Sequence, residues 1–178
     1  MNDSHSNEQP YADDTIKKLI ARFNDKVGMK RQEARLALIK AGNPAVPLLI
    51  EALSSSDEHV RWEAAKTLVS IKDPRAAPAL VNALMDKSSQ VRWLAAEALI
   101  ALRRSALVPL FKELELHADS VNLMQGAHHI LYDLKKAGIL NDSSLQVLTD
   151  VSALDNQMLV PLSARKALDS ILQSNGPE

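Results

Sequence analysis

The sequence predicts an all-α protein in which pairs of short helices stack into a solenoid. Two segments carry this prediction, VRWEAAKTL at 60–68 and VRWLAAEAL at 91–99, whose matched residues lie 31 positions apart. A fixed period of roughly 20–50 residues is typical of repeat architectures. The composition agrees, because 46% of the 178 residues are hydrophobic while only 3% are aromatic. A core of Leu, Ala, Val and Ile favours packed helices over sheets.

The N-terminal part of the chain reads as a degenerate first copy of the repeat. The segment QEARLALIKAGNPAVPLLIEAL matches the later copies at an offset of 30 in its first half and 31 in its second. Gly42 stands where the end of a helix favours a left-handed residue, and Pro44 follows it. We therefore expect helices at 13–26, 30–41 and 45–54.

The central part of the chain carries the clearest repeats, 58–88 and 89–118. Asp57 and Ser89 are placed to cap the first helix of each copy, and Pro78 and Pro109 mark the second helices. Apolar residues recur at helical spacing, and the paired alanines let a neighbouring helix approach closely. The expected helices are 58–71, 75–86, 89–103 and 106–117.

The C-terminal part contains a further degenerate copy. Gly126 and Ala127 stand where the paired alanines stood, and Gly138 follows a basic pair, as at the end of a helix. Departures from the pattern are expected in terminal repeats, because end units expose one face to water. The expected helices are 121–137, 143–151 and 158–173, giving a single repeat domain at 13–173 with disordered tails at 1–12 and 174–178.

The segment DEHVRWEAAKTLVSIKDPRAAPALVNAL resembles the short HEAT-like repeat named after phycobiliprotein lyases, with its V-R pair, paired alanines and D-P-R turn. The likeness covers 58–117 closely and 30–172 loosely. It implies a right-handed α-α superhelix of about four to five HEAT-like hairpins without a central active site. It also implies that Arg61 and Arg92 bond to acidic or carbonyl groups within the stack. The third copy departs from the pattern, with Arg103, Arg104 and Ser105 in place of the D-P-R turn.

Charge and residue content narrow the function classes. The net charge of −1 disfavours a general nucleic-acid binder. The charge is uneven, because 13–42 carries eight basic and four acidic residues whereas 113–160 carries two basic and seven acidic ones. This pattern fits solvated helical faces, an acidic end for a basic partner, or head-to-tail self-association. Absence of cysteine, of an apolar leader and of a run of roughly 20 apolar residues predicts a soluble cytoplasmic protein.

One candidate binding surface follows the first helix of each repeat. Trp62 lies far from the apolar stripe of its helix, at about 100° per residue, so we expect its ring to be at least partly exposed. Steps of 31 residues give a convex stripe of large side chains, Arg31, Trp62, Trp93 and Met124. Trp and Arg are enriched at binding hot spots. The structural alternative is that each tryptophan seals the groove between neighbouring repeats.

A second candidate surface follows the second helices, which usually line the concave side of solenoids. The same step gives a polar, mildly acidic groove formed by Glu51, Asn82 and Glu113 beside Ser55, Asp86 and His117. A basic or extended peptide would suit this groove. An ordinary solvated helix face is the alternative.

The sequence contains few candidate metal ligands and no recognised catalytic motif. Glu113 with His117, and His129 with Asp133, could each supply two metal ligands, but a zinc site takes at least three. There is no glycine-rich phosphate loop, G-x-S-x-G segment or cysteine nucleophile. We therefore predict no metal, no cofactor and no catalytic residues. The preferred hypothesis is a non-catalytic scaffold or adaptor that binds a protein partner; a bilin lyase subunit or phycobilisome-associated chaperone is the alternative, and a DNA-binding solenoid is disfavoured.

Overall fold

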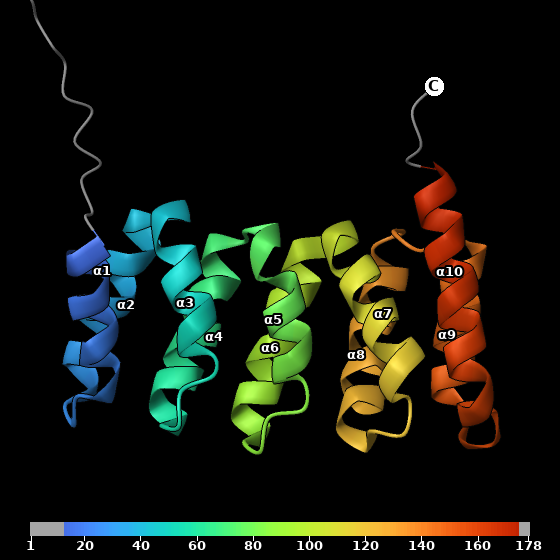
Figure 1. Ribbon diagram of the computed structural model, residues 1–178, viewed down its shortest axis with the longest axis horizontal. Helices are drawn as coiled ribbons and strands as arrows, with labels where there is room; N and C mark the ends of the chain where they lie inside the picture. Colours follow the sequence, from blue (N-terminus) through green and yellow to red (C-terminus); the bar gives the residue numbers. More distant parts are fainter. Residues whose placement is uncertain (1–12, 175–178) are drawn as a thin grey trace, which may run out of the picture.

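Two layers of helices run side by side along the long axis of the molecule (Figure 1). The computed structural model describes residues 13–174, which are helical or form short connections. The first-helix layer contains α2 (Gly28–Ala41), α4 (Glu58–Ile71), α6 (Ser89–Leu102), α8 (Val121–Lys136) and α9 (Asp142–Ser152). The second-helix layer contains α1 (Asp13–Ala21), α3 (Val46–Ala52), α5 (Ala77–Ala83), α7 (Leu107–His117) and α10 (Val160–Ser174).

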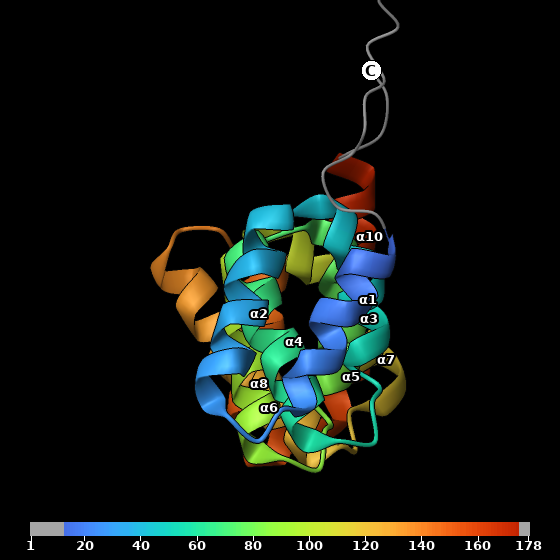
Figure 2. The same cartoon turned by 90° about the vertical axis from the view of Figure 1, so that its left-hand side faces the viewer.

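The view along the stack separates the two layers, with α1, α3, α5 and α7 on the right and α2, α6 and α8 on the left (Figure 2). Helices of the first-helix layer pack against their neighbours in that layer, and helices of the two layers also pack against each other, as α3 does against α4 and α5 against α6. Buried leucine and alanine side chains from both layers form one continuous core between them. The predicted all-α solenoid is confirmed.

The expected helices are all present, and their ends differ for identifiable reasons. The first expected helix stops at Ala21, where the 3₁₀ turn η1 (Arg22–Asn24) begins. The second helices start later than expected, because a 3₁₀ turn precedes each of α3, α5 and α7. These turns are η2 (Asn43–Ala45), η3 (Pro74–Ala76) and η4 (Arg103–Ala106), and a further turn, η5 (Leu154–Leu159), precedes α10. The expected tail at 1–12 lies outside the described residues, as do residues 175–178 of the tail expected at 174–178. Ser174 was expected in that tail but is the last residue of α10.

Helix caps explain where most of these elements begin and end. The Asp57 carboxylate accepts hydrogen bonds from the backbone N–H groups of His59 and Val60 at 2.7 and 3.3 Å. Ser89 is the first residue of α6 rather than its cap; Ser88 occupies the cap position, and its hydroxyl donates to Glu58 at 2.7 Å instead. Gly42 has the expected positive φ of 68°, a conformation that costs glycine no steric strain.

The α8–α9 connection changes the order of the stack. A second helix should follow α8, but α9 packs beside α8 in the first-helix layer instead. The chain then crosses through η5, and α10 packs beside both α9 and α7. The last pair of the solenoid is therefore α9 with α10, and Figure 1 shows this pair at the right-hand end.

The arginine of each V-R pair holds the turn that precedes its helix. Arg61 donates from Nη1 to the carbonyl oxygens of Ser55 and Ser56 at 2.8 and 3.1 Å. Arg92 donates from Nη1 to the carbonyl oxygens of Asp86 and Lys87 at 2.8 and 3.3 Å. The expected role of both arginines within the stack is confirmed.

The D-P-R turn joins two successive repeats. The Asp73 carboxylate accepts the backbone N–H of Arg75 at 2.9 Å and side-chain hydrogen bonds from Arg75 Nε and Nη2, the shortest at 2.6 Å. Arg75 Nη2 also donates to the carbonyl oxygen of Asn43 at 3.1 Å. The turn of one repeat is thereby tied to the turn before it.

Acid should weaken this turn. The hydrogen bonds from Arg75 hold the pKa of the Asp73 carboxyl below its ordinary value of 3.8. A carboxyl with a lowered folded-state pKa contributes stability that is present above the unfolded-state pKa and is lost as the pH falls through the folded-state pKa. Between about pH 5 and pH 2, the wild type should therefore lose more unfolding free energy than Asp73→Asn. Urea titrations across this range measure the difference, and parallel losses in the two proteins would contradict the assignment.

Candidate protein-interaction surface

Trp93 on α6 is a large exposed side chain that is nevertheless held in place. Its side chain is 58% exposed, and its ring stacks on that of His129 from α8, with centroids 4.9 Å apart and an interplanar angle of 22°. His129 Nε2 lies 3.2 Å from Glu97 Oε1 on α6. Because two neighbouring repeats fix the ring, a partner that contacts it would restrict little additional motion.

Trp62 on α4 occupies the equivalent position one repeat earlier. Its side chain is half-buried and packs against the core, while Lys66 Nζ lies 4.3 Å from the ring centroid in a cation–π contact. Trp62 and Trp93 together line a shallow depression whose floor includes Leu94. Partial burial agrees with the sealing role for Trp62, whereas Trp93 faces solvent.

A second depression begins on the other side of Trp93. Its walls include Arg92, Gln125 and His129, and Gly126 lets α8 approach the end of α5. A Cβ atom on Gly126 would lie 3.0 Å from Leu84 Cδ2, closer than ordinary van der Waals contact, so the Leu84 side chain would have to shift. The glycine that replaces an alanine in the fourth repeat therefore has a packing reason.

Met124 lies in a third depression, which shares Gln125 with the second. Its walls continue across α8 to Val151 and Ala153 at the end of α9. The three depressions follow one another across α4, α6 and α8. We call this line the tryptophan surface, defined by Trp62, Trp93, Met124, Gln125 and His129.

Arg31 does not continue the tryptophan surface. Its Nη1 donates to the carbonyl oxygen of Asp25 at 2.7 Å, six residues earlier, as Arg61 does to Ser55. The first helix matches the later copies at an offset of 30, so Arg31 corresponds to Arg61 and not to Trp62. The equivalent hydrogen bonds of Arg31 and Arg61 support this alignment, which differs from the predicted column with Trp62.

The predicted groove on the second-helix layer is less continuous than expected. Glu51 and Asn82 are exposed, and Glu113 is half-buried with its Oε1 3.5 Å from His117 Nε2. Asp86 does not face the groove as a free acidic group, because its carboxylate accepts Arg61 Nε and Nη2 at 2.7 and 3.0 Å. Both side chains of this pair are more than 90% buried, so Asp86 is structural.

The sequence analysis did not identify Glu63, a buried acidic residue on α4 in the second repeat. Its side chain is only 4% exposed, and its carboxylate accepts a hydrogen bond from Arg35 and lies 3.5 Å from Arg31 Nε, both on α2. These contacts between α2 and α4 join the first and second repeats. The signal was a glutamate directly before the paired alanines of α4, on the side that faces α2.

Metal ligands do not converge in the part of the chain that the structure describes: no three His, Asp or Glu side chains there could hold one ion. His129 contacts Glu97 and Trp93, and the structure shows no bond between it and Asp133. None of the helices in 13–174 is long and apolar enough to cross a membrane. The exposed side chains of the tryptophan surface are available to contact a binding partner.

One family model matches part of the chain. Residues 16–100 match the family model described as HEAT repeats. No curated protein matches the chain. Among solved structures, the crystal structure of an engineered protein is similar at 21% identity and a TM-score of 0.43, over 90% of this chain and 80% of that one.

Proposed function

Because residues 16–100 match the HEAT-repeat family model and the chain forms an all-α solenoid, we propose that the protein is a non-catalytic scaffold that binds a protein partner on the tryptophan surface. The observation that carries the proposal is the 58% exposure of Trp93 between two depressions. Exposed tryptophans are enriched among residues that dominate binding energies. A cytoplasmic location is part of the proposal.

The chemistry of the tryptophan surface indicates the kind of partner. Trp93, Leu94 and Met124 supply apolar area, while Gln125 and Ser89 supply hydrogen-bonding groups at its edges. The depressions are shallow and follow one another across successive helices. A partner segment that places apolar side chains at intervals along the stack fits this surface better than a single compact ligand.

Truncation of Trp93 should remove most of the affinity for the partner. We expect Trp93→Ala to weaken binding by about 2–4 kcal/mol, which is a roughly 30- to 1,000-fold higher Kd. The partner is first isolated on the immobilised wild type, and its Kd is then measured by titration calorimetry. Helical circular dichroism of the variant should be unchanged, because the side chain is mostly exposed.

Two further variants make the result specific. Leu172→Ala removes an apolar side chain of almost equal exposure, 57%, from α10 in the other layer, and it should leave the Kd within about twofold. Glu51→Lys tests the alternative groove. If Glu51→Lys abolished binding while Trp93→Ala did not, the partner would bind the second-helix layer and the proposal would be wrong.

The bilin-related alternative rests on the resemblance of 58–117 to the phycobiliprotein-lyase type of repeat. The exposed rings of the tryptophan surface offer a flat apolar contact to a tetrapyrrole as well as to a peptide. Visible absorption that persists on the protein after gel filtration with a bilin, and then moves to an acceptor protein, would favour the lyase over the scaffold.

A further inference from the structure

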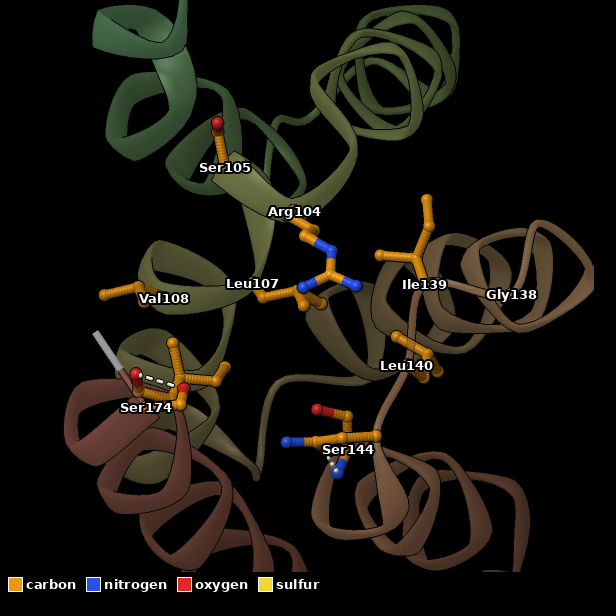
Figure 3. Close-up of a pocket in the computed structure, with 11 residues that line it drawn as sticks. Arg104, Ser105, Leu107, Val108, Gly138, Ile139, Leu140, Ser144 and Ser174 are labelled. Atoms are coloured by element: carbon orange, nitrogen blue, oxygen red, sulfur yellow. Dashed lines mark hydrogen bonds between the residues drawn. The ribbon is translucent and has the colours of Figure 1, made fainter.

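The largest departure from the repeat pattern lies beside a cavity of about 430 Å³ near the C-terminal end of the stack. Three segments enclose it: the turn η4 with the start of α7, the connection from α8 to α9, and the last turn of α10 (Figure 3). Small-molecule sites usually have volumes of roughly 300–1,000 Å³. This cavity is separate from the tryptophan surface and shares no residue with it.

Arg104 supplies the charge of the cavity. It takes the place of Asp73 in the repeat, so a cation stands where the preceding turn has its capping carboxylate. Figure 3 shows the Arg104 guanidinium extending between Leu107, Ile139 and Leu140. Among the side chains that the structure describes, which exclude those of residues 154 and 155, Arg104 has no ion-pair or hydrogen-bond partner. A guanidinium fork is suited to carboxylate and phosphate oxygens.

Ser144 supplies a buried polar group without a partner. Its residue is 1% exposed, and its Oγ atom is the one buried side-chain oxygen or nitrogen in the described part of the chain that has no hydrogen-bond partner. Most buried hydroxyls are hydrogen-bonded, so the Ser144 hydroxyl on the cavity wall is available to an oxygen atom of a bound group. Ser144 lies in the first turn of α9, whose Asn141 cap accepts the Ser144 N–H at 2.9 Å.

Apart from the exposed Ser105, the remaining walls are apolar or already hydrogen-bonded. Leu107, Val108, Ile139, Leu140 and Ile171 supply apolar side chains to the lining of the cavity. The Ser174 hydroxyl donates to the Ile171 carbonyl oxygen at 2.9 Å within α10. The first turns of α7 and α9 both open on the cavity, and helix N-termini favour negative charge. The acidic residue in the first turn of α9, Asp142, is exposed and does not line the cavity.

We propose that this cavity binds a small amphipathic anion, whose carboxylate or phosphate group meets Arg104 and Ser144 and whose apolar body lies against Leu107 and Ile139. The neighbouring arginine provides a matched control. Arg103 is also exposed and carries the same charge, but it does not line the cavity. If anions were attracted to the η4 turn only by its positive charge, Arg103 and Arg104 would contribute equally to binding. Of the two arginines, binding inside the cavity depends on Arg104 alone.

Titration calorimetry of the full chain with phenyl phosphate, benzoate and uncharged benzyl alcohol tests the proposal. At least one of the two anions should bind at least tenfold more tightly than benzyl alcohol. The tighter of the two identifies the phosphate or the carboxylate as the recognised group. Arg104→Gln should weaken its binding at least about tenfold, Ser144→Ala should weaken it several-fold, and Arg103→Gln should leave it within twofold.

Three outcomes would overturn the site: no binding of either anion at millimolar concentration, equal binding of benzyl alcohol, or equal losses in Arg103→Gln and Arg104→Gln. Unfolding in urea monitors the fold of each variant. Arg104 is exposed, so Arg104→Gln should unfold at the same urea concentration as the wild type. Partner binding through Trp93 is measured independently, so failure of either proposal leaves the other standing.

Discussion

Asp86→Ala is expected to reduce the free energy of unfolding by about 3–5 kcal/mol, the usual penalty for removing one partner of a buried ion pair. Asp86 accepts two hydrogen bonds from Arg61, and these bonds raise the pKa of the guanidinium above its ordinary value. In the variant Arg61 keeps its charge, because arginine does not lose its proton in proteins. This buried side chain, 4% exposed, retains hydrogen bonds to the Ser55 and Ser56 carbonyl oxygens. Urea unfolding followed by circular dichroism measures the loss.

Asp169→Ala is the matched control for this substitution. Asp169 lies 3.6 Å from Arg165 on the surface of α10, where both side chains are more than half exposed. Exposed pairs contribute roughly 0–1 kcal/mol, so this variant should be close to the wild type. Arg61→Met/Asp86→Ala removes the stranded charge and should recover part of the loss. If Asp86→Ala were no more destabilised than Asp169→Ala, Arg61 would not depend on its carboxylate.

Phe111→Ala should destabilise the protein by about 3–5 kcal/mol through the cavity that the lost ring leaves in the core. Phe111 is fully buried on α7, and α7 packs between α5 and α10 in the second-helix layer. In a repeat stack each unit depends on its neighbours, so loosening of α7 weakens both contacts. Calorimetric and urea unfolding of the purified variant give the size of the effect.

Leu116→Ala is the control for this substitution, because it shortens an exposed side chain on the same helix. It shows whether a loss of stability depends on burial or follows any truncation on α7. Leu116 is 71% exposed, and its replacement should change stability by no more than about 0.5 kcal/mol. A similar loss in the two variants would mean that α7 responds to any truncation. A loss below about 1 kcal/mol for Phe111→Ala would mean that the core closes around the missing ring.

The 31-residue period was enough to predict the helices, because the residues that begin and end each helix lie within the same repeat. Asp57, Gly42 and Gly138 act locally, and the structure places each of them at the helix end that the sequence indicated. The position of α9 could not be predicted in this way. Whether a helix after α8 joins one layer or the other depends on packing against α7 and α10, which lie far away in the sequence.

The candidate surfaces were predicted less completely, because a column of residues depends on the exact offset between repeats. Trp62, Trp93 and Met124 keep the 31-residue step and line successive depressions. Arg31 precedes the one-residue change in period and therefore has a different role. The Arg61–Asp86 pair shows the second difficulty: sequence spacing places a carboxylate on a turn, but only the packed structure shows which buried cation it contacts.

The position of α10 beside α7 has a consequence for the order in which the chain folds. Most helix contacts join elements that are close in the sequence, so they form without closing a long loop. The α7–α10 contact instead requires 118–159 to close, and loop closure costs conformational entropy. We expect the α9–α10 pair to dock last and to open first, with the earliest amide hydrogen exchange. The cavity lined by Arg104 and Ser144 would then exist only in molecules whose final helix has docked, so an anion bound there would slow the first step of unfolding.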